Sequence, residues 1–358
     1  MRLNKTYKRR ISGIIVAVLI ALTASFAAHC TDRPTMTFEE LSKRKLHHRP
    51  KGDGTFFNPW CDECRRGMSD FLYWKLVSTN RYAEQKKRPV AFRVRRPDFN
   101  ALESGKKDYA VWLGHSTVLI RANGVRILTD PVFGDINFLL KRKTALPIEA
   151  RNLPAIHYVI ISHNHYDHLD VASIRLLKKL FDPQFVTGPG YAGFFKTITD
   201  KHITLDWWET HEAEGVRITS LPAQHWSRRG VFDANDMLWA SYLIEGKGKR
   251  YYWAGDTGYF SAFREYGEKF GPVDAAFLPI GSYEPRWFMG VNHLNPEEAL
   301  KAAVELKARV FIPIHWGTFD LTDEPLYLPI ERLNEVIEDT PNPPRLEILD
   351  HGGWMVFE

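Results

Sequence analysis

The sequence predicts an α/β fold, in which short strands alternate with helices. From Tyr109 onward, short apolar runs rich in β-branched residues alternate with longer segments of helical periodicity. The run Ile156–Ile161 ends directly in the polar cluster Ser162–Asp170, which holds three histidines and two aspartates. Because α/β folds usually carry their chemistry in loops at strand ends, this cluster is the first candidate site.

The elements of the first half follow in order. Strands are expected at 111–113, 117–121 and 125–129, with Asn123-Gly124 as a type I′ hairpin turn between the last two. Val171–Phe181 is expected to be a helix, because its apolar residues fall on one face. The remaining elements of this half are strands at 185–187, 203–208, 215–220, 238–245 and 250–253 and a short helix at 190–196.

Helices and strands interleave in the second half. Asn295 as the N-cap, Pro296 at the first position and two glutamates in the first turn predict a helix over 296–307. The other predicted elements are helices at 260–269 and 326–338, strands at 275–279 and 310–314, and a pair at 346–349 and 354–357 that closes one sheet.

The N-terminus has the form of an export signal. A basic stretch precedes Ile11–Ala28, eighteen mostly apolar residues without a charge, which is just long enough to span a bilayer. Residues 1–30 are expected to be either a cleaved signal peptide or an uncleaved membrane anchor, with lipidation at Cys30 as a third alternative. Each alternative predicts an exported protein that is membrane-anchored or located in the periplasm or cell envelope.

Residues 31–105 are predicted to form an N-terminal arm that packs on a catalytic body at 106–358. The arm is rich in charge, proline and aromatic residues, and its basic run Lys43–Arg49 is expected to be a solvated linker. Cys61 and Cys64 form a lone C-x-x-C that cannot complete a structural zinc site. A small disulfide and two free thiols both remain open.

Composition and charge limit the classes of partner. The chain has 358 residues, of which 44% are hydrophobic and 25% charged, and this suffices for a sizeable core. Five of the basic residues behind the net charge of +5 lie in the first ten. No nucleic-acid-binding motif is present, so nucleic acid is not an expected partner.

Metal-binding residue types recur at the ends of predicted strands. Imidazole and carboxylate are ligands that zinc prefers, and a set of them at successive strand ends predicts a metal site. The residues are His163, His165, Asp167 and His168 in the cluster and His225, Asp256 and His315 after later strands.

These motifs resemble the metallo-β-lactamase superfamily, whose fold is an αββα sandwich with a dinuclear site at one edge. H-x-H-x-D-H, a later histidine, Gly-Asp-Thr and a final histidine match its pattern over about residues 108–357. Within the superfamily, Trp112–Thr117, Gln224–Ser227 and His315–Phe319 are similar to the N-acyl-phosphatidylethanolamine-hydrolysing phospholipase D family. The turn Phe57–Trp60 resembles the N-terminal arm of that family.

The resemblance implies two zinc ions, with other divalent metals as alternatives. Two such ions activate a water between them and neutralise charge on a phosphoryl group. A histidine at 165 argues against the di-iron branch, and aspartate at 256 argues against antibiotic hydrolysis, for which that position is cysteine. The implied ligands are His163, His165 and His225 for one zinc, Asp167, His168 and His315 for the other, and Asp256 as a catalytic bridge between both.

Three further residues are candidates for roles beside the metals. Asp130, at a strand end, is expected to accept an N–H from a ligand histidine and fix its tautomer. His115 is expected to support a ligand rather than to bind metal. The resemblance places His293 near the substrate as a catalytic residue, where it hydrogen-bonds the phosphate or helps the leaving alkoxide gain a proton. A surface histidine that precedes a helix is the alternative for His293.

The implied function is a zinc-dependent phosphodiesterase that hydrolyses N-acyl-phosphatidylethanolamine-like phospholipids to N-acylethanolamine and phosphatidic acid. A zinc-dependent lactonase or other ester hydrolase, and a non-catalytic zinc protein of the cell envelope, are the alternatives. The expected partners are a phospholipid or other phosphodiester, a membrane surface and, as an open point, a second copy in a homodimer. Several loop residues are expected either to line an acyl-chain groove or to pack in the core, namely Trp207, Trp208, Trp226, Trp287, Phe288 and Met289.

Overall fold

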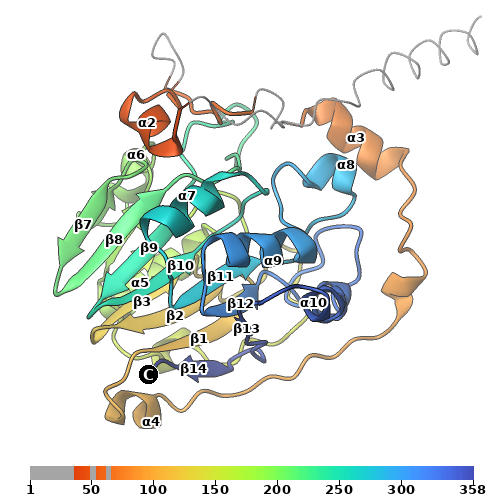
Figure 1. The fold of residues 1–358 in the computed structure, drawn as a ribbon. Helices are drawn as coiled ribbons and strands as arrows, with labels where there is room; N and C mark the ends of the chain where they lie inside the picture. The colour runs from red at the N-terminus through yellow and green to blue at the C-terminus, as the bar shows by residue number, and fades with distance from the viewer. Residues whose placement is uncertain (1–35, 49–53, 62–65) are drawn as a thin grey trace, which may run out of the picture. The chain divides into compact units, whose positions relative to one another are not determined.

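Two stacked β-sheets form the centre of the structure, a computed structural model that describes residues 36–48, 54–61 and 66–358 (Figure 1). The predicted export segment and Cys64 lie outside these residues, whereas Cys61 is described and is disulfide-bonded. Within the described ranges, no helix combines the length and the apolar character that crossing a membrane requires.

The described part of the chain contains two seven-stranded sheets that are built alike. The first sheet consists, in spatial order, of β14 (Trp354–Val356), β1 (Tyr109–Gly114), β2 (Thr117–Ala122), β3 (Val125–Thr129), β4 (Tyr158–Ile160), β5 (Gln184–Thr187) and β6 (His202–Thr204). The second consists of β13 (Arg345–Leu346), β12 (Val310–Ile314), β11 (Ala275–Pro279), β10 (Lys249–Trp253), β9 (Ser241–Gly246), β8 (Val216–Leu221) and β7 (Thr210–Ala213).

Strand direction explains where the loops of the two sheets meet. In the first sheet the pairs from β14 to β3 are antiparallel and those from β3 to β6 are parallel. In the second sheet the pairs from β7 to β10 are antiparallel and those from β10 to β13 are parallel. Since parallel strands end at the same edge of a sheet, the loops after β3 and β4, and after β10, β11 and β12, gather at common edges.

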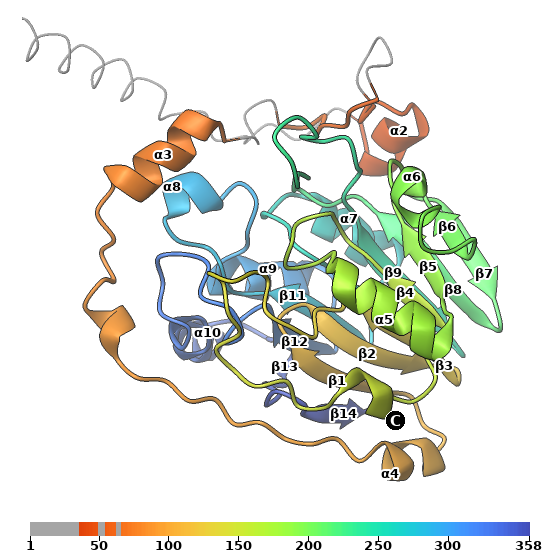
Figure 2. The same ribbon diagram turned by 180° about the vertical axis from the view of Figure 1, so that it is seen from behind.

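Helices cover the outer faces of both sheets. From behind, α5 (Val171–Phe181) and α6 (Ala192–Phe195) lie over the first sheet, as Figure 2 shows. From the front, α7 (Ala262–Lys269), α9 (Pro296–Glu305) and α10 (Leu328–Glu338) lie over the second (Figure 1). The predicted αββα sandwich is therefore confirmed.

The core has two layers around the first sheet. On β1, Ala110 and Trp112 belong to the cluster between the sheets, whereas Tyr109, Val111 and Leu113 belong to the cluster under α5. Because both faces are covered, all residues of β1 and β2 are buried. This continuous burial makes the edge of the sandwich, rather than a face, available for a site.

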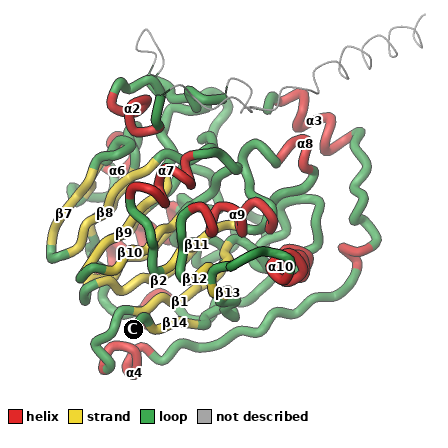
Figure 3. Tube along the Cα trace, in the orientation of Figure 1, coloured by secondary structure: helices red, strands yellow, loops and turns green. Residues whose placement is uncertain are grey.

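The segment before β1 runs along the sandwich and contacts it at several points. It includes α2 (Phe38–Lys43), α3 (Met68–Leu76) and α4 (Phe99–Ser104), and between α3 and α4 it is mostly loop, with one short turn at Gln85–Lys87 (Figure 3). Trp74 donates its indole N–H to Asp323 Oδ1 at 3.0 Å, and a second small helix, α8 (Arg286–Met289), packs on α3.

The basic run at 43–48 is not simply the solvated linker that the sequence predicts. His47 is completely buried, and its Nε2 lies 2.7 Å from Asp206 Oδ1, while Nε2 of His48 lies 2.9 Å from Oδ2 of the same carboxylate. The ring of His47 stacks on Trp207 with centroids 4.4 Å apart. The carboxylate of Asp206, from a distant loop, therefore binds two histidines that composition alone predicts to lie at the surface.

Most predicted elements agree with the structure, but the pairing of the last two strands was wrong, the predicted strand 203–208 ends at Thr204, and one strand was missed. The predicted helix 171–181 and the strands at 125–129, 275–279 and 310–314 have the observed bounds. The segments near 345 and 354 pair with β12 and β1, respectively, and so end different sheets rather than closing one. The strand Thr210–Ala213 was not predicted, because its four residues are polar or small and sit at a sheet edge.

Candidate metal centre

The loop after β4 is folded by its own backbone. The N–H groups of His168 and Leu169 both donate to the His165 carbonyl, at 3.1 and 2.9 Å. This turn places the rings of His165 and His168 with centroids 4.5 and 4.1 Å from the ring of His163. Asp170 then closes the loop, because its carboxylate accepts from two N–H groups in the first turn of α5.

Three imidazoles converge on one point. Nε2 of His163 lies 2.8 Å from Nδ1 of His165, and Nε2 of His225 lies 3.3 Å from that same Nδ1. His225 follows β8, and its Nδ1 lies 3.0 Å from the carbonyl oxygen of Asn292, which leaves Nε2 directed at the other two rings. The three donors form one group that could hold a metal ion.

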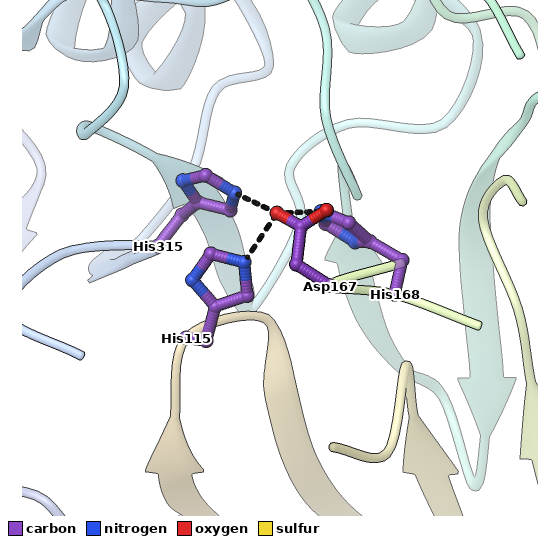
Figure 4. Close-up of side chains that lie close together, drawn as sticks. All are labelled: His115, Asp167, His168 and His315. Atoms are coloured by element: carbon purple, nitrogen blue, oxygen red, sulfur yellow. Dashed lines mark hydrogen bonds and ion pairs between the residues drawn. The ribbon is translucent and has the colours of Figure 1, made fainter. Parts of the chain in front are cut away.

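Figure 4 shows a second group around the carboxylate of Asp167. Its Oδ2 lies 2.9 Å from Nε2 of His115, 3.4 Å from Nε2 of His168 and 3.9 Å from Nε2 of His315. His115 comes from the β1–β2 turn, and its ring lies against His315 with centroids 3.9 Å apart. Its contact with Asp167 has the form expected of a residue that supports a ligand, and its nitrogen is also close enough to be a fourth donor.

Asp256 lies between the two groups. Its Oδ2 is 3.0 Å from Nε2 of His168, and its Oδ1 is 3.2 Å from Nε2 of His315. Its carboxylate also belongs to a group of possible metal donors with His225 and His293. Gly255 allows this approach, because φ is +60° there and a Cβ atom would stand 2.5 Å from Cβ of Ser162. The carboxylate therefore faces donors from both groups.

Asp130 contacts two residues of this loop, Ser162 and His168, through its carboxylate. Its carboxylate accepts from the N–H and the hydroxyl of Ser162, at 2.8 and 2.6 Å, and its Oδ2 lies 2.6 Å from Nδ1 of His168. Asp130 and His168 are both completely buried. The contact leaves Nε2 of His168 as the atom that faces Asp167 and Asp256.

Burial keeps the histidines of the first group in their neutral form. It lowers the pKa of His165 to about 4 and that of His225 to about 3. It likewise lowers the pKa of His163 well below its usual value, with neighbouring histidines acting in the same direction. At neutral pH these rings are free bases, which is the form that binds a metal ion.

The carboxylates around His168 favour a positive charge on its ring. Burial lowers the pKa of this ring, but Asp256, Asp167 and Asp130 outweigh burial and raise it well above its usual value. Burial raises the pKa of Asp256, but the charges of His168 and His315 hold it well below the ordinary range. Carboxylates that stabilise a positive charge at this position would also stabilise a divalent metal ion there.

Buried polar atoms without partners provide a separate test of the fit. Nε2 of His168, Nε2 of His315 and Oδ1 of Asp256 are inaccessible and make no hydrogen bond of normal geometry, although both nitrogens lie within ion-pair distance of the Asp256 carboxylate. Such atoms are rare in proteins, because each loses its bonds to water without replacement. All three belong to the groups described above, so the residues present fit divalent metal ions.

Nδ1 of His293 is also buried without a hydrogen-bond partner. It lies 3.8 Å from Oδ2 of Asp256, and the ring stands edge-on to His225 with centroids 5.2 Å apart. Burial lowers the pKa of His293 to about 3. His293 is therefore a buried neutral ring at the site rather than a surface residue.

Arg229 and Tyr166 connect the two ligand loops, and sequence reasoning did not identify them. The Tyr166 hydroxyl donates to the Arg229 carbonyl at 3.0 Å, and the guanidinium lies 4.1 Å from the tyrosine ring centroid. Because Arg229 lies four residues after His225, these contacts between Tyr166 and Arg229, here called the clamp, connect the His225 loop to the H-x-H-x-D-H loop. Nη1 of the arginine also donates to three carbonyls of that loop at 3.0, 3.4 and 2.6 Å, those of Asn164, His165 and Leu169.

The aromatic residues predicted near the site do not share one environment. Trp207 is buried and packs in the core, whereas Trp226 is half-buried, with its ring 4.6 Å from that of His165. Trp287 and Phe288 are half-buried on α8 and face the rings of α3. Trp226 is therefore placed directly beside a candidate ligand, His165, and Trp207 is not.

Comparisons with known proteins show which proteins this chain resembles. A family model described as a β-lactamase superfamily domain matches residues 125–316. An N-acyl-phosphatidylethanolamine-hydrolyzing phospholipase D 1 of Caenorhabditis elegans is 39% identical over 265 residues, which are 67% of this chain and 72% of that protein. A mitochondrial N-acyl-phosphatidylethanolamine-hydrolyzing phospholipase D of Saccharomyces cerevisiae is 37% identical over 64% of this chain, and the match spans about half (52%) of that protein. Among solved structures, Igni18, a metallo hydrolase of Ignicoccus hospitalis, aligns with a TM-score of 0.54 and 22% identity over 70% of this chain and 99% of its own.

Proposed function

We propose that this chain, which belongs to the β-lactamase superfamily, is a metal-dependent phosphodiesterase of the phospholipase D reaction type. Divalent metal binding follows from membership in a superfamily of metallo-hydrolases. The observation that carries the proposal is the position of Asp256 between two groups of buried donors. The names of the worm and yeast relatives support a phospholipid as the substrate.

The two groups fit two metal ions, for which we propose zinc. When bound, the ions supply charge that stabilises a phosphoryl oxygen and lower the pKa of a water. Asp256 would contribute to both ions, and His115 would hold Asp167 in place through its Nε2 contact. The proposed ligands are His163, His165 and His225 for one ion and Asp167, His168 and His315 for the other.

His293 is proposed to contact the substrate. Its ring is neutral at neutral pH because burial lowers its pKa to about 3. A neutral imidazole can donate an N–H to a phosphoryl oxygen, but it carries no extra proton for a leaving group. Hydrogen bonding to the phosphate is therefore favoured over proton delivery to the leaving oxygen.

The proposed reaction adds water across one P–O bond of an N-acyl-phosphatidylethanolamine. The oxygen of water forms a new bond to phosphorus, the bond from phosphorus to the ethanolamine oxygen breaks, and that oxygen leaves with a proton. The products are phosphatidic acid and an N-acylethanolamine.

A lipid surface is the proposed partner. Phe138, Leu139 and Phe232 expose 82%, 75% and 95% of their areas, and two basic residues, Lys141 and Arg228, lie close to them in sequence. Exposed apolar side chains beside basic residues suit a membrane with anionic headgroups. Export by the N-terminal segment and a homodimer remain proposals that accompany this one.

The test is turnover by purified, zinc-loaded protein of three substrates: N-acyl-phosphatidylethanolamine, an aryl phosphodiester and an acyl lactone. We expect hydrolysis of the phospholipid, with phosphatidic acid and N-acylethanolamine formed in equal amounts. Turnover of the lactone alone would contradict the proposal and favour the ester-hydrolase alternative. Two bound zinc ions without any turnover would favour the non-catalytic alternative.

A matched pair of variants connects the activity to the site. Asp256→Asn should lower zinc content and the rate of hydrolysis together, because an amide offers a metal ion only one oxygen, and that oxygen is neutral. Asp274→Asn changes a buried aspartate that accepts from Arg250 N–H and Arg309 Nη1, at 2.8 and 2.7 Å, away from the centre. It should leave zinc content unchanged.

A further inference from the structure

The arm residues 56–60 contact the loop that carries His225, although they lie outside the matched family domain. Asn58 is 5% exposed, and its Nδ2 donates to the main-chain carbonyl of His225 at 2.9 Å. Its Oδ1 accepts from the indole N–H of Trp239 at 3.1 Å. Because both ends of the amide are bonded, its orientation is fixed, with the N–H toward His225.

The same arm segment holds both sides of this loop. Trp60 donates its indole N–H to Oε1 of Gln224 at 3.1 Å, and the Phe56 N–H donates to the Asn235 carbonyl at 2.8 Å. The side-chain amide of Gln224 in turn donates to the Val291 carbonyl at 2.9 Å. The residue before His225 is therefore tied to the arm on one side and to the loop before His293 on the other.

The position of the His225 ring depends on this backbone. The ring is completely buried, and Nε2 reaches the first donor group only while Nδ1 meets the Asn292 carbonyl. Both contacts involve one side chain, so a rotation of its main chain displaces Nε2 from His165. A hydrogen bond at the carbonyl oxygen opposes that rotation.

We propose that Asn58 is a positioning residue for metal binding, which holds His225 in the orientation that its Nε2 needs to act as a ligand. This inference rests on the proposed function, because it takes His225 to bind a metal ion. Its consequence is that the N-terminal arm is part of the metal centre. The domain recognised at 125–316 would then lack a contact that sets the geometry of one ligand.

The test substitution is Asn58→Asp, which keeps the size of the side chain and the acceptor for Trp239. It replaces the donor by an oxygen that faces the His225 carbonyl oxygen. Zinc affinity is measured on the full chain by competition with a chelator, and Co²⁺ absorption spectra report the ligand geometry. We expect the affinity of the ion held by His225 to fall about tenfold, with an altered Co²⁺ spectrum, and that of the other ion to change little.

Asn80→Asp is the matched control. Asn80 is also an arm asparagine, and its Nδ2 donates to the main-chain carbonyl of Asp323 at 3.1 Å while its Oδ1 accepts from the Tyr82 N–H at 2.7 Å. The chemistry is the same, but Asp323 is not a proposed ligand. Both zinc affinities and the Co²⁺ spectrum should match the unmodified protein.

The outcomes separate the inference from the proposed function. Unmodified protein that binds no zinc would contradict the proposed function itself. Two zinc ions bound by Asn58→Asp with unchanged affinities would overturn the role of Asn58 and leave the function standing. An equal loss in Asn80→Asp would also overturn it, because the effect would then be general. If Asn58→Asp does not fold, Asn58→Ala removes the donor without adding a charge and is judged by the same criteria.

Discussion

Replacement of Asp130 by asparagine should change the tautomer of His168. Oδ2 of Asp130 faces Nδ1 of His168 at 2.6 Å, so Nδ1 keeps a proton, and Nε2 is the nitrogen that would give up its proton and present a lone pair to a bound metal ion. Asparagine can keep an oxygen for the Ser162 N–H, which Asp130 binds at 2.8 Å, and it then presents an N–H to Nδ1. The ring satisfies that donor only by moving its proton to Nε2.

The cost can be worked from these contacts. A proton on Nε2 occupies the position from which His168 would bind metal, 3.0 Å from Asp256 Oδ2. Loss of a residue that orients a ligand histidine typically lowers metal affinity 10–100-fold, which corresponds to about 1.4–2.7 kcal/mol. Since Asp130 and His168 are completely buried, water cannot replace the lost contact, and the upper half of that range is expected.

The assay is zinc affinity by chelator competition, with zinc content per chain after dialysis as a second readout. Asp274→Asn serves as the control, because it changes a buried aspartate whose partners are not proposed ligands. Asp130→Asn protein that folds and retains two zinc ions at unchanged affinity would refute the tautomer argument. Equal losses in both variants would attribute the effect to general destabilisation.

Three further predictions concern the clamp, acid stability and metal removal. Arg229→Ala should lower stability by about 2–3 kcal/mol in denaturant unfolding, because charged hydrogen bonds to three carbonyls are lost; an effect below 0.5 kcal/mol would contradict the clamp. Burial raises the pKa of Asp206, but hydrogen bonds from His47 and His48 outweigh it and hold the pKa at about 2. The resulting stabilisation of about 2 kcal/mol is present above about pH 4 and is lost as the pH falls through the folded-state pKa. In Asp206→Asn, the free energy of unfolding should therefore depend less on pH between about pH 4 and 2. Chelation of the metals should lower the melting temperature, since a ligand at a thousand times its Kd stabilises the folded state by about 4 kcal/mol. Identical melting curves with and without chelator would contradict metal binding by the folded state.

The fold and the candidate ligands could be predicted from the sequence because both leave strong local signals. A buried strand followed by His163, His165, Asp167 and His168 combines an apolar run with residue types that are rarely clustered without a metal. Single ligands such as His315 gain significance from their repetition at strand ends. The parallel strands of each sheet then bring these ends to one edge, which is a property of the topology rather than of any one motif.

Contacts between distant segments could not be predicted in this way. His47 has the sequence environment of a basic linker, yet it is buried on Asp206, 159 residues away. Arg229 has the appearance of a surface cation, yet it caps carbonyls of the ligand loop. Arginine, asparagine and histidine are common on surfaces, so residue type alone carries no information about such partners.

The centre therefore contains two kinds of residue: those that supply donor atoms and those that orient them. The donor atoms come from the loops after strands, where a local motif supplies them. Their geometry is set by residues that bind no metal, such as Asp130 beneath His168 and Asn58 behind His225. A site whose donors are buried has little freedom to adapt, because close packing transmits any shift of the backbone to the ligand atoms. In the proposed centre, the residues that set metal affinity would therefore include several outside the ligand set, and the arm that precedes the sandwich would supply one of them.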